Sequence, residues 1–224
     1  MENIWAVIPA YNEQKNIARV IKEAKNYVDE IILVDDGSKD STAKFGQAAG
    51  AIVLRHVVNL GKGAALKTGC DYAVKNGAEL IVVLDADAQH NPGDIPRFIE
   101  KLKKYDIVFS YRKASKKMPF VLRFGNKFIS NIVRILYNVN LTDTQSGFRA
   151  FSRETYKKIR WNAADYSMES EMISRVGKQK LKYVQIPIQT IYTDRYKGTT
   201  VLDGIKIVLN MVWWRLFRFN GSGQ

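Results

Sequence analysis

The sequence contains few of the residues that build disulfides or metal centres rich in sulfur and imidazole. Its 224 residues include one cysteine, Cys70, and two histidines, His56 and His90. One cysteine excludes an internal disulfide, and this set is too small for a zinc site of the Cys/His type. Cys70 stands in an apolar run, so we expect it to be a small core residue. This cysteine usage favours a reducing, cytosolic setting.

Long apolar runs are also missing. No stretch of about 18 or more uncharged apolar residues occurs, so no transmembrane helix is expected. The N-terminal stretch MENIWAVIPAYNE lacks the basic segment and long apolar core of a signal peptide. With 46% hydrophobic residues, the chain can still form a substantial core, and its length suits one large domain.

Acidic residues are scarce relative to basic ones. The formal net charge is +13, and residues 107–142 contain seven basic residues and no acidic one. Such an excess favours a polyanionic partner, which could be a nucleic acid, anionic lipid headgroups or a phosphorylated substrate.

Short apolar segments alternate with helical patterns in the first half of the chain. Strands are expected within residues 3–10, 30–38, 51–56, 79–87 and 106–112, and helices within residues 13–28, 38–50, 59–77 and 92–104. The strand segments are apolar throughout rather than alternating, which is typical of strands buried on both faces. The pattern therefore predicts an α/β fold with a mostly parallel sheet flanked by helices. Further strands are expected near residues 182–192.

Two later segments have the pattern of amphipathic helices. In residues 119–139, large apolar side chains recur every four residues, and residues 204–219 place Trp213, Trp214, Phe217 and Phe219 beside Arg215 and Arg218. Aromatic and basic residues together suit a helix that lies in a membrane interface. The alternative is a helix whose apolar stripe packs on the sheet, and both can hold on different faces.

Polar clusters follow the expected strands, at the edge where ligands bind in such sheets. After the fourth strand come Asp85, Asp87 and Gln89. In an extended segment these alternate residues point the same way. Their hard oxygen ligands suit a Mg²⁺ or Mn²⁺ ion that is also coordinated by substrate phosphates. The alternative is a solvated acidic turn, which the position after a buried strand makes less favourable.

Three further groups of residues are candidates for binding a phosphorylated nucleoside. In VDDGSKDST, Asp36 could accept hydrogen bonds from a base or ribose, while Asp40 or Ser41 caps the next helix. In NLGKG, Lys62 between two glycines could meet an anion, although the sequence is not a P-loop and a plain turn is the alternative. Arg112, Arg123 and Arg195 suit phosphate because their charge is fixed and their donors are forked.

These motifs together resemble a known family. VIPAYNE, VDDGS and DAD in the first 112 residues resemble the GT-A fold of family 2 glycosyltransferases. NLGKGAALKTG, DADAQH, TDTQSGFRAF, MESEM and YTDRYKGTT resemble the polyprenyl-phosphate hexosyltransferases, including the dolichol-phosphate mannose synthases. The resemblance covers residues 4–208. Thr199 stands where the family often has serine, and members often carry transmembrane helices after the catalytic part.

The resemblance implies a metal-dependent, inverting transfer of a hexose from a nucleotide sugar to a polyprenyl or dolichyl phosphate. Mannose from GDP-mannose is the favoured donor; UDP-glucose, or a hydroxyl acceptor, is the alternative. By resemblance, the nucleoside of the donor is held by Pro9, Ala10, Tyr11, Glu13 and Asp36, and the rest of the donor by Lys62, Asp85, Asp87, Glu169 and Glu171. The metal is held by Asp85, Asp87 and Gln89. The catalytic residues are Asp87, Arg112, Arg123 and Arg195, of which the three arginines surround the donor and acceptor phosphates.

The organisation expected from these patterns is a single catalytic domain with an appended helix. Residues 1–112 would bind the nucleotide sugar, residues 113–198 the acceptor, residues 199–219 would form the C-terminal amphipathic helix, and residues 220–224 a disordered tail. We expect a cytoplasmic enzyme at the inner membrane surface. An acceptor phosphate is already anionic and needs no general base; Asp143 could be one, but nothing in the sequence identifies it. A nucleic-acid-binding module is a weaker reading, because the acids cluster at strand ends.

Overall fold

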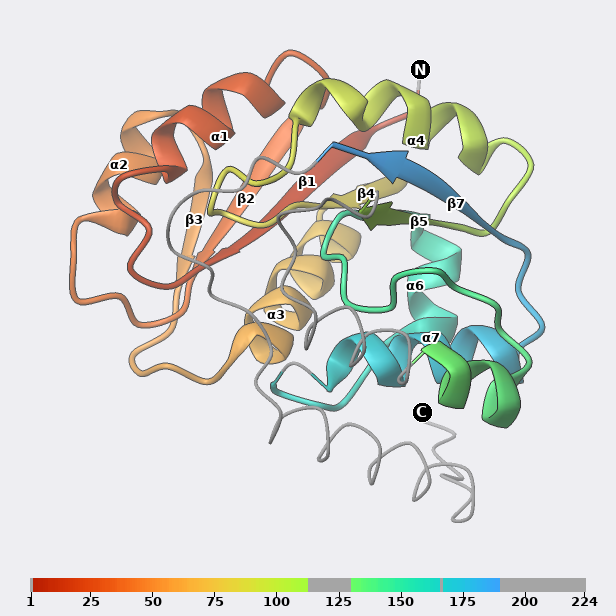
Figure 1. The fold of residues 1–224 in the computed structure, drawn as a ribbon. Helices are drawn as coiled ribbons and strands as arrows, with labels where there is room; N and C mark the ends of the chain where they lie inside the picture. Colours follow the sequence, from red (N-terminus) through yellow and green to blue (C-terminus); the bar gives the residue numbers. More distant parts are fainter. Residues whose placement is uncertain (1, 113–129, 166, 190–224) are drawn as a thin grey trace.

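The fold is built on one seven-stranded sheet (Figure 1). The computed structural model describes residues 2–112, 130–165 and 167–189. In chain order the strands are β1 (Ile4–Ala10), β2 (Glu30–Asp35), β3 (Ile52–Arg55), β4 (Leu80–Val83), β5 (Ile107–Arg112), β6 (Arg149–Ser152) and β7 (Tyr183–Ile188). Their spatial order is β3-β2-β1-β4-β6-β5-β7, and β6 alone among these strands runs antiparallel to its neighbours. The expected mostly parallel α/β sheet is confirmed.

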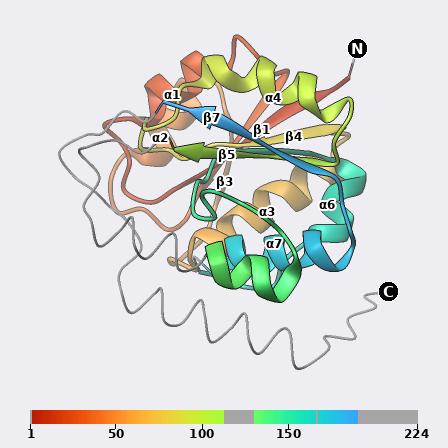
Figure 2. The same ribbon diagram turned by 45° about the vertical axis from the view of Figure 1, so that its right-hand side comes forward.

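Helices cover both faces of the sheet (Figures 1 and 2). On one face lie α1 (Ile17–Ala24), α2 (Thr42–Ala48) and α4 (Ile95–Leu102), which follows the 3-10 turn η1 (Pro92–Asp94). On the other face lie α3 (Lys62–Lys75), α6 (Arg153–Ile159) and α7 (Met168–Lys178). Each face has its own apolar core, with Phe98 stacked on Phe148 in the first and Trp161 fully buried in the second. Cys70 is buried in the second core, as expected.

The direction of β6 determines what lies at the ligand-binding edge. The carboxyl ends of β1, β2, β3, β4, β5 and β7 share one edge, because these strands are parallel. Since β6 runs the opposite way, its first residue lies at that edge, and Arg149 pairs with Val83, the last residue of β4. Residues 143–148, which lead into β6, are therefore placed beside the segment after β4. The sequence patterns predicted neither β6 nor α6.

Part of the first amphipathic segment packs on the core. Residues 130–137 are helical, and Val133 and Tyr137 are buried while Ile135 is exposed. This agrees with the packing alternative for that part of the segment. The described residues do not include residues 113–129 with Arg123, or the C-terminal amphipathic segment and Arg195. What the sequence predicts for these residues stays a prediction, as does the division of the chain into a donor-binding and an acceptor-binding half. No helix in the described part of the chain has the length and apolar character to cross a membrane.

Candidate active site

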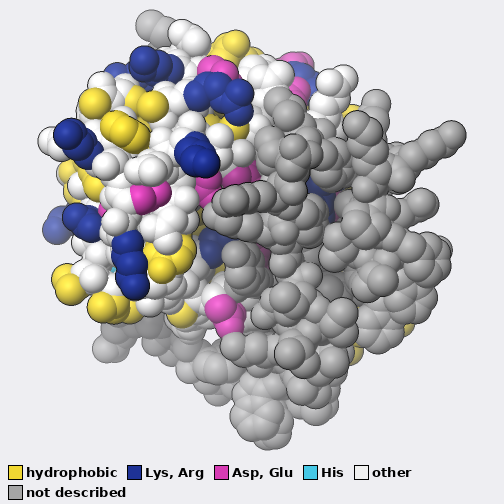
Figure 3. Space-filling view, turned by 60° about the vertical axis from the view of Figure 1, so that its left-hand side comes forward, with side chains coloured by type: hydrophobic (Ala, Val, Ile, Leu, Met, Phe, Trp, Pro, Cys, Tyr) yellow, Lys and Arg dark blue, Asp and Glu magenta, His cyan; other side chains and the backbone are white. Residues whose placement is uncertain are grey.

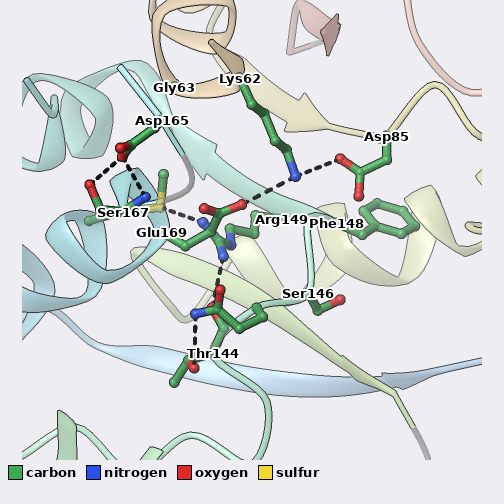
Figure 4. A network of polar contacts seen from close by, with 12 residues as sticks. Lys62, Gly63, Asp85, Thr144, Ser146, Phe148, Arg149, Asp165, Ser167 and Glu169 are labelled. Atoms are coloured by element: carbon green, nitrogen blue, oxygen red, sulfur yellow. Dashed lines mark hydrogen bonds and ion pairs between the residues drawn. The ribbon is translucent and has the colours of Figure 1, made fainter. Parts of the chain in front are cut away.

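A lysine at the start of α3 joins two carboxylates at the edge of the sheet (Figure 4). Lys62 Nζ lies 2.9 Å from Asp85 Oδ1 and 3.2 Å from Glu169 Oε1. Asp85 follows β4, and Glu169 lies in the first turn of α7, so three elements far apart in sequence meet here. Glu169 is buried, and Lys62 and Asp85 are largely buried. The structure thus brings together three of the predicted donor-binding residues.

The charges in this cluster shift one another's pKa values. Burial acts to lower the pKa of Lys62, but Asp85 and Glu169 outweigh it, so the lysine stays protonated. Burial acts to raise the pKa of Asp85, yet Lys62, followed by His90, brings it down to about 2. The pKa of Asp87 is raised to about 6 by burial and then by the negative charge of Asp85. The two carboxylates of the D-x-D pair therefore repel each other.

The predicted metal ligands lie in a turn rather than in an extended segment. β4 ends at Val83, Ala88 has a positive φ of 60°, and Asp87 Oδ1 accepts a 3.0 Å hydrogen bond from the Gln89 N–H. The extended geometry expected for this segment is therefore wrong, although the two carboxylates still interact through their charges.

The residues after β4 fit a cation that is shared with a substrate. Within the described ranges, no group of three or more His, Cys, Asp or Glu side chains could hold a metal by itself. Mg²⁺ and Mn²⁺, however, are commonly held by one or two carboxylates together with substrate phosphates. The mutual repulsion of Asp85 and Asp87 is what a divalent cation would relieve, and the Gln89 amide adds a neutral oxygen of the same hard type. This donor set is compatible with the predicted ion.

Gly147, in the segment that leads into β6, and Arg149, the first residue of β6, support the cluster, and the sequence analysis gave neither a role. A Cβ atom added to Gly147 would lie 2.7 Å from Asp85 Cγ and collide with both carboxylate oxygens. Arg149 is buried behind Glu169, where it donates a 3.2 Å hydrogen bond to the Thr144 carbonyl (Figure 4). Burial lowers the pKa of Arg149, and the charges of Glu169 and Asp85 oppose that shift. Both residues belong to the motif TDTQSGFRAF, which is the sequence feature that could have pointed to them.

Asp36 binds the protein's own backbone with both oxygens. Its Oδ1 accepts a 2.9 Å hydrogen bond from Leu60 N–H and lies 2.7 Å from His56 Nδ1, and its Oδ2 accepts a 2.8 Å bond from Gly61 N–H. His56 Nε2 in turn lies 3.0 Å from Thr68 Oγ1. The carboxylate therefore fixes the turn that leads into Lys62. The contact of Asp36 with a nucleoside stays a prediction.

The two glycines of NLGKG are required by packing within the protein. A Cβ atom on Gly61 would lie 2.5 Å from the Ala164 carbonyl oxygen, and one on Gly63 would lie 2.8 Å from the Ala164 carbonyl carbon. Trp161 Nε1 donates to the Gly63 carbonyl at 2.8 Å. The close approach that these glycines allow is therefore to residues 161–165, which places the start of α3 against the loop before α7.

The predicted nucleoside-binding residues at the end of β1 lie at the same edge. Pro9 and Ala10 are buried, and the Ala10 carbonyl accepts a 2.9 Å hydrogen bond from Asp36 N–H. Tyr11 is exposed, and the Glu13 N–H donates to Thr42 Oγ1 at 2.8 Å. Asp40 caps α2 as expected, because its Oδ1 accepts a 3.0 Å hydrogen bond from the N–H of Thr42, the first residue of that helix. Ser41 makes no side-chain capping bond.

Arg112 and Asp143 form a forked ion pair at the end of β5. Arg112 Nε lies 2.6 Å from Asp143 Oδ2, and Nη2 lies 3.1 Å from Oδ1. Burial acts to raise the pKa of Asp143, but Arg112 lowers it below its ordinary value. A carboxylate held in this way is a weak base. Its geometry orients the guanidinium instead.

Glu169 and Glu171 have different surroundings although they are two residues apart. The Glu171 carboxylate lies 2.8 Å from Arg175 Nη2 and accepts hydrogen bonds from the N–H groups of Asn162 and Ala163. It anchors the segment that packs on Gly63, whereas Glu169 faces Lys62. For both glutamates, contact with the donor stays a prediction.

Comparison with known proteins agrees with this architecture. The family model described as glycosyl transferase family 2 matches residues 5–160. The UDP-N-acetylglucosamine–dolichyl-phosphate N-acetylglucosaminyltransferase of Methanococcus voltae is 35% identical over 241 residues, covering 95% of this chain and 96% of the relative. The undecaprenyl-phosphate mannosyltransferase of Micrococcus luteus is 26% identical over 230 residues, covering 95% and 94%.

Solved structures show the same fold at low sequence identity. Glucosyl-3-phosphoglycerate synthase from Mycobacterium tuberculosis, in complex with Mg²⁺ and uridine diphosphate, has a TM-score of 0.77 and is 21% identical. The match covers 96% of this chain and 79% of that chain. The chain therefore belongs to glycosyl transferase family 2, has the GT-A fold and is a glycosyltransferase, which confirms the predicted family and enzyme class.

Proposed function

We propose that this protein transfers a hexose from a nucleotide sugar to a polyprenyl or dolichyl phosphate, with inversion at the anomeric carbon. The observation that carries the proposal is the buried cluster of Lys62, Asp85 and Glu169 beside Asp87, at the sheet edge where ligands bind. Two relatives that align over 95% of the chain are named for transfer to dolichyl and undecaprenyl phosphate, which supports the acceptor class.

A divalent cation, Mg²⁺ or Mn²⁺, would be held by Asp85, Asp87 and Gln89. When bound, it supplies positive charge to the diphosphate that leaves the sugar. The solved relative binds Mg²⁺ with uridine diphosphate, which supports this use. Lys62 keeps its proton beside Asp85, so the chain adds a second fixed positive charge close to the donor phosphates.

The reaction needs little proton transfer from the protein. An oxygen of the acceptor phosphate attacks the anomeric carbon, a new carbon–oxygen bond forms, and the bond to the nucleoside diphosphate breaks with its electron pair. The acceptor is already an anion, so no general base is required. Arg112, oriented by Asp143, offsets repulsion between the two anionic substrates. Arg123 and Arg195 are proposed to contact the same phosphates.

The sugar and the nucleotide define two candidate donors. GDP-mannose, the donor expected from the sequence, agrees with the relative named as a mannosyltransferase. The relative at 35% identity is named for UDP-N-acetylglucosamine, which favours a UDP-sugar as the second candidate and extends the expected alternative of UDP-glucose. The enzyme would act as a peripheral protein at the cytoplasmic membrane surface, because the acceptor lipid resides there.

A donor panel tests the proposal. Purified protein is incubated with radiolabelled GDP-mannose, UDP-glucose or UDP-N-acetylglucosamine, polyprenyl phosphate in vesicles, and Mg²⁺ or Mn²⁺. We expect metal-dependent incorporation of one sugar into the lipid fraction. Transfer only to a soluble hydroxyl acceptor, with none to the lipid for any donor, would show that the acceptor class is wrong.

A further inference from the structure

The loop between β3 and α3 exposes three large apolar side chains in four residues. Val57 is 99% exposed, Val58 60% and Leu60 51%. Across the described residues, seven large hydrophobic side chains are exposed, and these three are the ones that are close together in sequence. Single exposed apolar residues are ordinary, but a contiguous group indicates an interaction site.

The loop is held firmly, so its exposure is part of the fold. Asp36 binds both ends, through His56 on one side and the N–H groups of Leu60 and Gly61 on the other. The middle of the loop rests on Gly37, where a Cβ atom would lie 2.7 Å from the Val58 carbonyl carbon. A buried carboxylate and a close backbone contact therefore keep residues 57–60 turned outward.

Basic side chains lie beside this apolar loop. Arg55, just before the loop, has an exposed side chain that lies 3.2 Å from the buried Asp35 Oδ2 through Nε and donates a 2.9 Å hydrogen bond to the Ser38 carbonyl. Lys39, the residue after Ser38, is exposed as well. Figure 3, which brings the left-hand side of Figure 1 forward, shows lysine and arginine side chains interspersed with hydrophobic ones and with fewer acidic ones on this face. Apolar side chains flanked by positive charge match the interface of an anionic bilayer.

We propose that residues 57–60 contact the lipid of an anionic membrane and orient the active site toward it. This inference rests on the proposed function, because an acceptor phosphate on a lipid must be reached at the bilayer surface. Leu60 is two residues from Lys62, and the Asp36 contacts join the loop and Lys62 into one rigid unit. Contact of the loop with lipid therefore fixes the height of Lys62 relative to the headgroups.

A label on the loop tests the contact without requiring activity. Cys70 is the sole cysteine and is buried, so a Val57→Cys variant takes an environment-sensitive fluorophore at position 57. The matched control is Phe45→Cys, which replaces an exposed apolar residue of α2. Vesicles of phosphatidylcholine and phosphatidylglycerol should increase the emission intensity of the fluorophore at position 57 about twofold and shift its emission to shorter wavelength. The emission of the fluorophore at position 45 should stay nearly unchanged.

Two outcomes of the labelling would overturn the proposal. One is unchanged emission at position 57 while the protein cosediments with the vesicles. The other is an emission change that depends on protein concentration without vesicles, which would indicate that a second copy of the chain covers the loop.

An activity ratio separates this inference from the proposed function. For a Val57→Asn, Val58→Asn double variant, transfer to polyprenyl phosphate in vesicles is divided by transfer to a short-chain acceptor in detergent. The ratio should fall about tenfold relative to the wild type. An unchanged ratio overturns the lipid contact, since the variant then affects both acceptors alike. If the wild type transfers to neither acceptor, the proposed function fails, and the fluorescence measurement still decides the membrane contact.

Discussion

Lys62 Nζ lies 2.9 Å from Asp85 Oδ1, so the first carboxylate of the D-x-D pair is already paired with a cation of the protein. Burial opposes the charge of Lys62, but Asp85, together with Glu169 on the other side of the lysine, outweighs that effect. The site thus holds one lysine between two carboxylates, with Asp87 as a third carboxylate nearby. The predictions below follow from this arrangement and from the groups that hold it.

Replacing Lys62 with methionine should abolish most activity and destabilise the fold. The substitution leaves Asp85 and Glu169 facing each other without the cation between them, and breaking a buried pair costs about 3 kcal/mol. The pKa of Asp85 should rise from about 2 as well. Urea unfolding and sugar transfer are the measurements, with Lys75→Met on the exposed end of the same helix as the control. A variant with wild-type stability would contradict the pairing.

Gly147→Ala should reduce turnover about a hundredfold, because the new methyl group occupies the position of the Asp85 carboxylate. Gly93→Ala is the control, since its Cβ atom would lie 3.1 Å from the Asn91 side chain, which can shift. Circular dichroism verifies that both variants fold. If Gly147→Ala transfers sugar at the wild-type rate, Asp85 is not needed in its observed position.

The metal-free protein should lose stability as the pH rises from about 4 to 6. Asp87 has a pKa of about 6 in the folded state against 3.8 ordinarily, so the folded state holds a proton that the unfolded state has released. Stability falls as that proton leaves, by roughly 1–3 kcal/mol at about 1.4 kcal/mol per pKa unit. Asp85 is already ionised in this window.

Asp87→Asn provides the control for this titration. Unfolding by urea in the presence of EDTA should show a smaller decline between pH 4 and 6 for the variant than for the wild type. The variant should also lose most of its metal-dependent activity while staying folded. An identical pH dependence in the two proteins would mean that another group titrates.

Asp36→Ala should loosen the turn that leads into Lys62. The Leu60 and Gly61 amides lose their acceptor, so hydrogen exchange at residues 60–64 should accelerate and kcat should fall. Asp40→Ala, which affects the start of α2, is the control and should leave those amides unchanged. If Asp36→Ala raises only the KM for the donor and exchange is unaltered, Asp36 acts on the nucleoside directly.

The sequence by itself determined the framework of this protein. Apolar segments without alternation predict buried parallel strands, and the structure contains them at residues 4–10, 30–35, 52–55, 80–83 and 107–112. The acidic pair after the fourth strand predicted a candidate site at one edge of the sheet, because the carboxyl ends of parallel strands meet there. The motifs also identified the family correctly. All of this information is local, carried by side-chain type and spacing along the chain.

The tertiary structure decided which residues meet at that edge. β6 inserts antiparallel between β4 and β5, which brings Gly147 and Arg149 beside Asp85 from more than sixty residues away. Helix phase separates Glu169 from Glu171, since side chains two residues apart point to different sides of a helix. Strand pairing and helix orientation depend on packing between distant segments, so no local pattern could specify them.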